Sequence, residues 1–342
     1  MNIVEASSQR IHGGPDALGV PRFDFSSNSN ACGPCPIVLA AVQQADATYY
    51  PDASYATLRA RLAAFHGVEA QRVLLAGSAS EFIFRITACM AQQGERDGQG
   101  KVCLPPYSYG DYAQAAQAWG LGLTAQPMEA QLVWACEPSS PLGGAHAFWP
   151  GVLPAPVVLD RAYEPLRLSS APSLTEAQLA QVWQLWTPNK ALGLTGVRAA
   201  YVIAPLGAQA TVAALERLCA SWPLGAHGVA LLQAWVQPRV QAWLAGSLPV
   251  LRDWKARQVA MLQALGWTCL PSDANFFCAR PGQALDLNRS RAAGIKLRDA
   301  ASFGLSGHVR ISVQPPAAQD ALKMAWQSMA TPAPNSTNRE MT

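Results

Sequence analysis

Short β-rich runs alternate with helical stretches over much of this chain, and no other feature limits the possible folds as strongly. The run RVLLA (72–76) precedes a GSAS turn (77–80) and a helical spacing of apolar residues over 81–91. Repeated strand–turn–helix units are typical of a mainly parallel sheet that is covered by helices. Further strands are expected at 101–104, 131–135, 156–160 and 199–204, separated by helices at 108–119, 174–186 and 208–220. The pattern therefore predicts an α/β domain.

The two ends of the chain depart from this alternation. A polar arm precedes helices expected near 37–46 and 54–66, and Gly67 is placed to end the second. After position 230 we expect a long helical stretch broken at Pro238 and again near Gly246 to Pro249, strands at 275–279, 295–298 and 308–314, and a final helix. The predicted divisions are an arm (1–35), a large domain (36–230), a smaller α+β domain (231–330) and a disordered tail (331–342).

Composition excludes several classes of function. The net charge of +3 is spread without a block of Lys or Arg, which gives no electrostatic case for nucleic acid or an anionic membrane surface. No apolar run is long enough to span a membrane, and Glu5 and Arg10 interrupt the start where a secretory signal would be apolar. A globular, cytoplasmic protein is predicted.

Eight cysteines are scattered in mostly apolar surroundings, as small buried side chains are in a reducing compartment. Cys32-Gly33-Pro34-Cys35 spells the redox motif of thioredoxins, but it follows a polar turn and not a long buried strand. A redox function and an ordinary two-cysteine turn both stay open. Because no second such motif or Cys/His cluster exists, no metal site is predicted.

Lys190 stands alone among small and apolar residues. It is one of only five lysines, and it is the sole charged residue from Ala177 to Val197. Burial in such surroundings can hold a lysine in the neutral, nucleophilic form, which Schiff-base chemistry requires. The alternative is a solvated lysine in a loop.

Nearby residues could bind an oxyanion. Arg198 precedes the strand AAYVIA and Thr187 lies three residues before Lys190, so a guanidinium and a hydroxyl could face one phosphate. The GSAS turn adds backbone N–H groups at the start of a helix, which is a common anion site. Many such turns contain Gly and Ser without binding an anion.

The run PVVLD (156–160) resembles a buried strand that ends in a carboxylate, and Tyr163 follows it. The carboxyl edge of a parallel sheet faces the ligand crevice. Asp160 could there pair with a pyridinium nitrogen and make a cofactor an electron sink. A turn or helix-cap Asp is an equally ordinary interpretation.

Together these elements resemble the class I/II aminotransferases, pyridoxal 5'-phosphate enzymes of fold type I, from His12 to the strand ending near 314. The segment TPNKALGLTGVR is similar to the lysine motif of that family. The resemblance implies that Lys190 holds the cofactor as a Schiff base and that Thr187 and Arg198 bind its phosphate. DRAY (160–163) implies Asp160 at the pyridine nitrogen and Tyr163 at the ring hydroxyl.

Three further segments carry the resemblance. GSASE (77–81) implies that the backbone at Ala79 and Ser80 cradles the phosphate, and PPYSYGDY implies that Tyr109 stacks on the cofactor ring. Tyr50, in YYPD, matches a tyrosine that reaches the phosphate of the neighbouring subunit, which implies a homodimer. The large domain would thus bind the cofactor.

Two positions depart from the family pattern. EPSSPLGG places Ser140 where the family has an Asn that holds the ring hydroxyl, and serine cannot donate from an amide. Asn189 replaces a serine that is common before the lysine.

The ends of the chain resemble one branch, which contains histidinol-phosphate aminotransferases and the threonine-phosphate decarboxylases of cobalamin synthesis. HGG (12–14), FDFSSNSN (23–30) and KLRDAASFGLSGHVRISV (296–313) favour the decarboxylase. That match implies Arg310 at the substrate carboxylate, with His12, Asn30 and Arg298 near the substrate phosphate. A surface or arm role is the alternative for His12 and Arg298. The expected function is decarboxylation of a small phosphorylated amino acid, with transamination as the alternative and a non-catalytic sensing module as a distant one.

Overall fold

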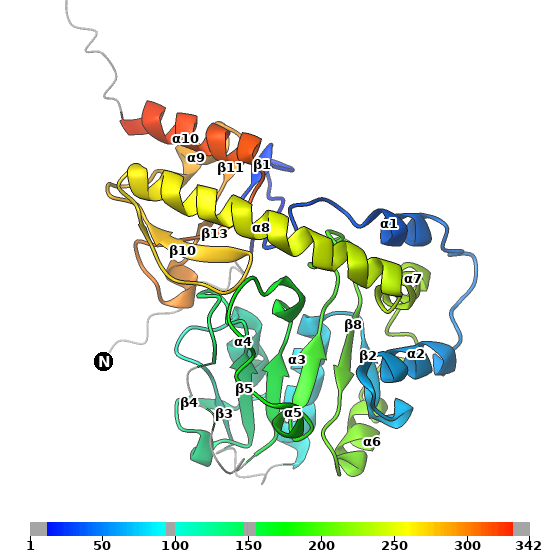
Figure 1. The fold of residues 1–342 in the computed structure, drawn as a ribbon. Coiled ribbons are helices and arrows are strands. Elements are labelled where there is room, and N and C mark those ends of the chain that lie inside the picture. The colour runs from blue at the N-terminus through cyan, green and yellow to red at the C-terminus, as the bar shows by residue number, and fades with distance from the viewer. Residues whose placement is uncertain (1–11, 94–99, 147–148, 150–154, 331–342) are drawn as a thin grey trace, which may run out of the picture.

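A computed structural model describes residues 12–93, 100–146, 149 and 155–330 (Figure 1). A seven-stranded sheet forms its largest part. In spatial order its strands are β2 (Val73–Ala76), β8 (Ala200–Ile203), β7 (Trp183–Trp186), β6 (Val157–Asp160), β5 (Leu132–Cys136), β3 (Lys101–Cys103) and β4 (Gly122–Thr124). Within it β8 alone runs antiparallel to its neighbours. The predicted tail and the start of the arm lie outside the described residues.

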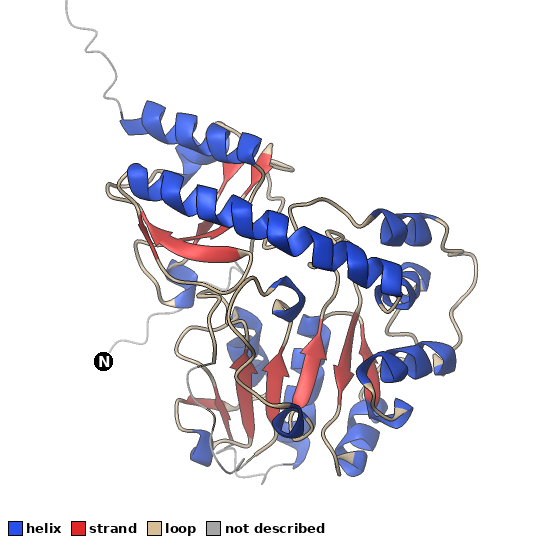
Figure 2. Ribbon diagram, viewed as in Figure 1, coloured by secondary structure: helices blue, strands red, loops and turns tan. Residues whose placement is uncertain are grey.

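Helices cover both faces of this sheet (Figures 1 and 2). Alternate residues of β2 divide between the two layers, because Leu75 packs toward one apolar cluster and Leu74 toward the other. The first layer contains α1 (Pro36–Gln43), α2 (Ala56–His66) and α7 (Ala226–Trp235), and the second contains α3 (Ala79–Gln93), α4 (Gly110–Ala118) and α6 (Gln209–Arg217). The mainly parallel α/β fold is as predicted.

The expectation of a helix over 174–186 is wrong. Only α5 (Glu176–Leu179) is helical, and the WQLW run forms β7. All four residues of β7 are buried, since both faces of the strand are covered. A short apolar run of this kind shows no period that separates strand from helix.

A second, four-stranded sheet has the order β12 (Arg298–Asp299), β13 (Val309–Ser312), β10 (Phe276–Arg280) and β9 (Thr268–Cys269). It packs with α8 (Pro238–Ala264) and α10 (Pro316–Ala330), while α9 (Leu287–Ala292) leads into β11 (Ile295–Lys296). The arm joins this part of the molecule, because β1 (Phe23–Asp24) pairs in parallel with β11. The predicted domain boundaries remain predictions.

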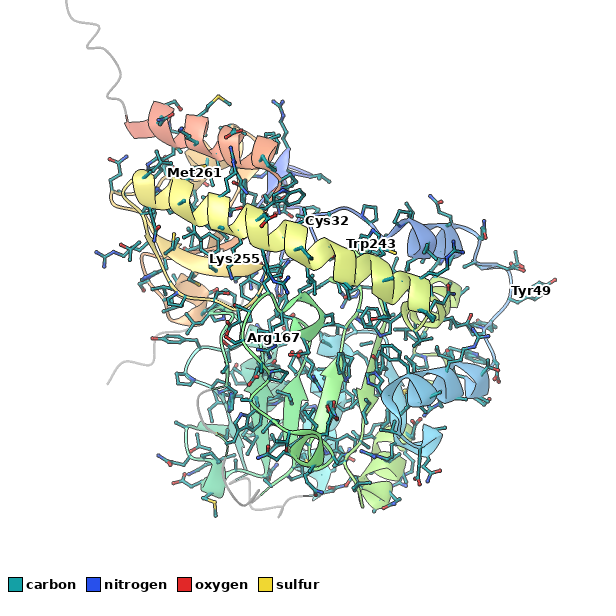
Figure 3. The ribbon with its side chains drawn as sticks, in the orientation of Figure 1. Cys32, Tyr49, Arg167, Trp243, Lys255 and Met261 are labelled. Atoms are coloured by element: carbon teal, nitrogen blue, oxygen red, sulfur yellow. The ribbon has the colours of Figure 1, made fainter. Side chains whose placement is uncertain are left out.

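Helix α8 passes along both sheets, with Trp243, Lys255 and Met261 along its length and Cys32 of the arm beside it (Figure 3). The expected break at Pro238 is where α8 begins, but the break expected near Gly246 to Pro249 is wrong, since the helix continues through Pro249. An interior proline costs a helix about 3 kcal/mol, which the packing of α8 offsets. No described helix, α8 included, is long and apolar enough to cross a membrane.

Candidate active site

A cavity of about 120 Å³ lies at the ends of β5 and β6, beside the loop after β7 and the start of α3. Such crevices at the carboxyl ends of parallel strands are the usual ligand sites of this fold class. Ten of the residues predicted from the sequence line it: Ala79, Ser80, Tyr109, Ser140, Asp160, Tyr163, Thr187, Lys190, Arg198 and Arg310. Segments that are far apart in the sequence therefore converge on one cavity.

Lys190 occupies a tight loop after β7. Its Nζ lies 5.3 Å from the centre of the Tyr163 ring, and its side chain is half-buried. Residues 28–35 form a strap across this loop: the Asn30 N–H donates to the Lys190 carbonyl at 2.9 Å, and the Cys35 N–H donates to the Leu192 carbonyl at 2.9 Å. The strap fixes the backbone that carries the lysine.

One glycine makes this contact between strap and loop possible. Gly193 has φ +70°, and a Cβ there would lie 2.6 Å from the Gly33 carbonyl oxygen. Because a side chain at this position would meet backbone on the strap, the loop can sit against it only with glycine.

The wall beside Lys190 is suited to an anion. Helix α3 begins at Ala79, so its first backbone N–H groups and its positive dipole end face the cavity. Thr187 is buried, and its hydroxyl has no hydrogen-bond partner among the described residues. Arg198 and Asn189 lie on the same lining, and Asn189 Nδ2 donates to the carbonyls of Thr195 and Val197, which close the loop. These groups could hold a phosphate.

Asp160 ends β6 at the floor of the cavity and is 5% exposed. Its Oδ2 accepts a hydrogen bond from the Tyr112 hydroxyl at 2.7 Å, and its Oδ1 accepts one from the Ala162 N–H at 2.9 Å. Burial raises the pKa of Asp160 above its ordinary value, opposed by the Tyr112 bond and the charge of Lys190. A cationic ring nitrogen would stabilise this carboxylate.

Sequence reasoning missed Tyr112, although a signal was present. Tyr112 lies three residues after Tyr109, and i and i+3 positions share a helix face. The two rings meet edge to face with centres 5.8 Å apart, and Tyr109 also bonds to Ser80 through its hydroxyl at 3.3 Å. The predicted stacking residue and Tyr112 therefore form one aromatic wall.

Ser140 lines the cavity and also contacts Arg310. Its hydroxyl oxygen accepts a hydrogen bond from Arg310 Nη1 at 3.1 Å, and Arg310 Nη2 donates to the Ser26 carbonyl at 3.1 Å. Arg310 is buried, and its Nε has no hydrogen-bond partner among the described residues. A buried guanidinium without a carboxylate partner calls for an anionic ligand.

An outer cleft continues the cavity toward the surface past Lys190, Tyr109 and Arg310. His12, the first described residue, lies on it with its ring centre 6.1 Å from that of Tyr109. Asn28 also lines the cleft, and its Nδ2 donates to the Tyr163 hydroxyl at 3.3 Å. Sequence reasoning missed Asn28.

Asn30 lies outside the lining of this cleft, and its expected role near a substrate phosphate remains a prediction. Asn30 Nδ2 donates to the Ala191 carbonyl at 3.0 Å and to Ser247 Oγ at 2.9 Å, and its Oδ1 accepts the Cys32 N–H. These bonds commit the amide to holding the strap. Although only two residues apart, Asn28 lines the cleft and Asn30 holds the strap.

Arg298 is also outside the lining of both cavity and cleft. It pairs in register with Arg310 across β12 and β13, and its guanidinium bonds to the Asp299 carbonyl and to Ser302 Oγ, each at 2.7 Å. Burial, together with the charge of Arg310, lowers the pKa of Arg298 to about 10. Arg298 thus lies next to Arg310 on the neighbouring strand, and its expected role near a substrate phosphate remains a prediction.

Tyr50 lies away from the cavity of its own chain. It is 78% exposed and stacks on Trp222 with ring centres 4.5 Å apart. Its exposed position is compatible with the predicted contact with a neighbouring subunit.

The surroundings of the two motif cysteines do not suit redox chemistry. Cys35 is fully buried at the start of α1, and burial raises the pKa of the Cys32 thiol, whereas disulfide exchange requires an accessible thiolate. Both are free thiols. The motif serves as the strap across the lysine loop.

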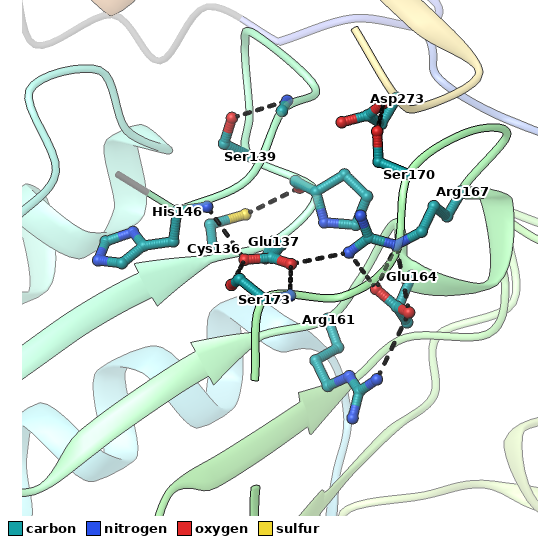
Figure 4. A network of polar contacts seen from close by, with 12 residues as sticks. Cys136, Glu137, Ser139, His146, Arg161, Glu164, Arg167, Ser170, Ser173 and Asp273 are labelled. Atoms are coloured by element: carbon teal, nitrogen blue, oxygen red, sulfur yellow. Dashed lines mark hydrogen bonds and ion pairs between the residues drawn. The ribbon is translucent and has the colours of Figure 1, made fainter. Parts of the chain in front are cut away.

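A polar cluster supports the cavity from behind (Figure 4). Glu137 follows β5 and is 3% exposed; its carboxylate accepts bonds from Arg167 at 3.0 Å, from the His146 N–H at 3.0 Å and from Ser173. Arg167 also pairs with Glu164 at 2.8 Å. The cluster joins the loop that carries Ser140 to the turn that carries Tyr163.

Comparison with known proteins agrees with this arrangement. A family model described as aminotransferase class I and II matches residues 122–327, more than half of the 342-residue chain. Histidinol-phosphate aminotransferase 1 of Thiobacillus denitrificans is 28% identical over 323 residues, which cover 86% of this chain and 83% of the relative.

Two solved structures share the fold. Histidinol-phosphate aminotransferase from Sinorhizobium meliloti, in complex with pyridoxal-5'-phosphate, has a TM-score of 0.75 at 23% identity and covers 94% of this chain and 96% of its own. L-threonine-O-3-phosphate decarboxylase from Porphyromonas gingivalis has a TM-score of 0.73 at 19% identity, covering 89% and 98%.

Proposed function

Because the chain belongs to the class I and II aminotransferase family, we propose that it is a pyridoxal-phosphate enzyme acting on a small amine or amino acid that carries an anionic group. One observation carries the proposal. Lys190, the buried carboxylate of Asp160 and the start of α3 face a single cavity from three sides. An amine, a carboxylate and an anion site are the three groups that this cofactor requires.

The residues present fit the cofactor. Arg198, the start of α3 and the unpartnered hydroxyl of Thr187 would hold its phosphate. Asp160 would hold its ring nitrogen, and Tyr163 would contact its ring hydroxyl. The cofactor, when bound, supplies an electron sink for the electrons left at the α-carbon of the substrate.

The side chains of this protein then have separate tasks. Lys190 Nζ would hold the cofactor and would take up or return a proton at the α-carbon of the substrate. Arg310 binds and orients an anionic group of the substrate, and the Tyr109 ring covers the cavity and excludes water.

The first candidate reaction is amino-group transfer with a phosphorylated amine such as histidinol phosphate. The relative from Thiobacillus denitrificans supports it, since the alignment covers most of both chains. In this reaction Lys190 would take the proton from the α-carbon of the substrate.

The second candidate is decarboxylation of O-phosphothreonine, as in cobalamin synthesis. It is favoured by the way the two end segments meet: β1 pairs with β11, Lys296 Nζ donates to the Gly14 carbonyl at 2.6 Å, and Arg310 bonds to Ser26. The segments that resemble the decarboxylase therefore build one wall of the cleft.

One experiment separates the candidates. The purified protein with pyridoxal phosphate is given histidinol phosphate with 2-oxoglutarate, or O-phosphothreonine, and both carbon dioxide and keto product are measured. Glutamate from the first mixture supports transfer, and carbon dioxide from the second supports decarboxylation. A protein that neither binds the cofactor nor forms either product would contradict the whole proposal.

A homodimer is part of this proposal, with Tyr50 reaching the cofactor phosphate of the partner subunit. The exposed position of Tyr50 outside its own cavity supports it. Cytoplasmic localisation remains a prediction from composition.

A further inference from the structure

A buried phenol on the lining of the cavity contacts Asp160. Tyr112 on α4 is completely buried, and its hydroxyl lies 2.7 Å from Asp160 Oδ2. Burial, together with the adjacent Asp160, raises the pKa of Tyr112 well above its ordinary value, so the phenol keeps its proton and acts as the donor. A hydrogen bond of this kind favours the ionised form of the carboxyl group.

The position of Tyr112 is fixed on two sides. Its ring stacks on Trp134 of β5 with centres 4.3 Å apart and planes 10° apart, and the Tyr109 ring lies nearly perpendicular to it with centres 5.8 Å apart. Because neither neighbour leaves room for the ring to turn, the hydroxyl is held toward Asp160.

Asp160 needs such a donor. Its burial opposes ionisation, and three influences act against that effect: the Tyr112 bond, the charge of Lys190 and the Ala162 N–H. The charge of Lys190 is not constant, since a lysine that holds the cofactor through its Nζ no longer carries an isolated ammonium group. Tyr112 and Ala162 are the influences that persist through a reaction.

We propose that Tyr112 is a positioning residue that keeps Asp160 ionised and aimed into the cavity, and that through Asp160 it sets the proton affinity of the cofactor's ring nitrogen. The effect of Tyr112 on the ring nitrogen rests on the proposed function. The effect of Tyr112 on the ionisation of Asp160 does not, because it involves only these two side chains.

The first test is made on the full chain without cofactor. Aspartate labelled with ¹³C at the carboxyl carbon reports the ionisation of Asp160 by NMR in the wild type and in Tyr112→Phe, with Asp160→Asn used to assign the signal. Loss of the phenol hydroxyl should move the pKa of Asp160 upward. The matched control is Tyr201→Phe, which removes the hydroxyl of another fully buried tyrosine, bonded to His66 and Trp235, and should leave that pKa unchanged.

A second variant guards against a Tyr112→Phe protein that does not fold. Incorporation of 3-fluorotyrosine at position 112 keeps the shape of the side chain and makes the phenol a stronger donor. The pKa of Asp160 should then move downward, in the direction opposite to the Phe variant. An Asp160 signal that titrates identically with tyrosine, fluorotyrosine and phenylalanine would overturn the proposal.

The effect on the ring nitrogen is read from bound cofactor. In Tyr112→Phe the absorbance titration of the cofactor should shift, and cofactor affinity should fall on the order of tenfold. Both effects should vanish when Tyr112→Phe is made in an Asp160→Asn background, because the two residues act through one bond. If the wild type bound no cofactor, the proposed function would fail while the NMR result still decided the effect of Tyr112 on Asp160.

Discussion

The polar cluster around Glu137 and the cavity that contains Lys190 both lie at the strand ends. They differ in whether their buried polar groups have hydrogen-bond partners. Behind the cavity, Glu137 receives hydrogen bonds from Arg167, from Ser173 and from a backbone N–H. Inside the cavity, the Thr187 hydroxyl and the Arg310 Nε have no partner among the described residues. Buried polar groups are normally paired, so the unpaired Thr187 hydroxyl and Arg310 Nε are candidates for contact with a ligand, whereas the bonds to Glu137 hold the structure around the cavity.

The strongest test of this contrast removes the amine from the unpaired region. Lys190→Ala should lower activity on the order of 10⁴-fold, because it removes both the attachment point and the proton carrier. Borohydride reduction followed by denaturation should leave cofactor on the wild type alone. Cofactor that stays attached in the variant would contradict the role of Lys190.

The paired region should respond through stability. Arg167→Ala leaves the buried Glu137 carboxylate without its ion-pair partner, so we expect a loss of about 3 to 5 kcal/mol in urea unfolding. Lys101→Ala is the matched control, because it breaks the exposed Lys101–Glu129 pair, and it should cost at most about 1 kcal/mol. If both variants lost the same free energy of unfolding, the Glu137 cluster would contribute no more to stability than an exposed ion pair.

Two buried threonines, one with an unpartnered hydroxyl and one with a bonded hydroxyl, allow a further comparison. Thr187→Ala removes an unpartnered hydroxyl, so it should weaken cofactor binding on the order of tenfold while leaving apoprotein stability nearly unchanged. Thr87→Ala removes a hydroxyl that donates to the Ile83 carbonyl at 2.7 Å, and it should lower stability by about 1 kcal/mol without changing cofactor affinity. The reverse pattern would mean that Thr187 is structural.

The smallest effect concerns the unliganded floor of the cavity. Burial raises the pKa of Asp160, so its ionisation costs more free energy in the folded chain than in the unfolded chain. This cost is absent at acidic pH and grows as pH rises from the unfolded-state pKa to the folded-state pKa. The apoprotein of Asp160→Asn should therefore exceed the wild type in stability at neutral pH, and the difference should shrink toward pH 4. A wild type that is the more stable at neutral pH would contradict this.

The site residues that could be predicted are those whose chemical role has a signal in the neighbouring sequence. Asp160 at a strand end, Lys190 among uncharged residues and the GSAS turn each carry a local signal, and the alternation of strands and helices brings them to one edge. Tyr112 and Asn28 carried weaker signals. Asn28 and Asn30 have the same chemistry, and only the tertiary path of the strap decides which one faces the cleft.

The fold shows the same limit. Alternation predicted the parallel sheet, but β7 was indistinguishable from a helix because both its faces are buried. Pro249 is a local signal for a break that long-range packing of α8 overrides. The pairing of β1 with β11 joins residues more than 270 positions apart, which no local pattern encodes.

The strap formed by residues 28–35 limits how this chain can be divided. The segment that the family model matches, 122–327, contains Lys190, Asp160 and Arg310, yet it lacks the strap that bonds to the carbonyl of Lys190. A fragment limited to that segment would contain Lys190 on a loop that lacks the hydrogen bonds from the strap. The segment that the family model matches is therefore smaller than the unit that holds Lys190 in place, and an engineered or recombined version must inherit both ends of the chain together.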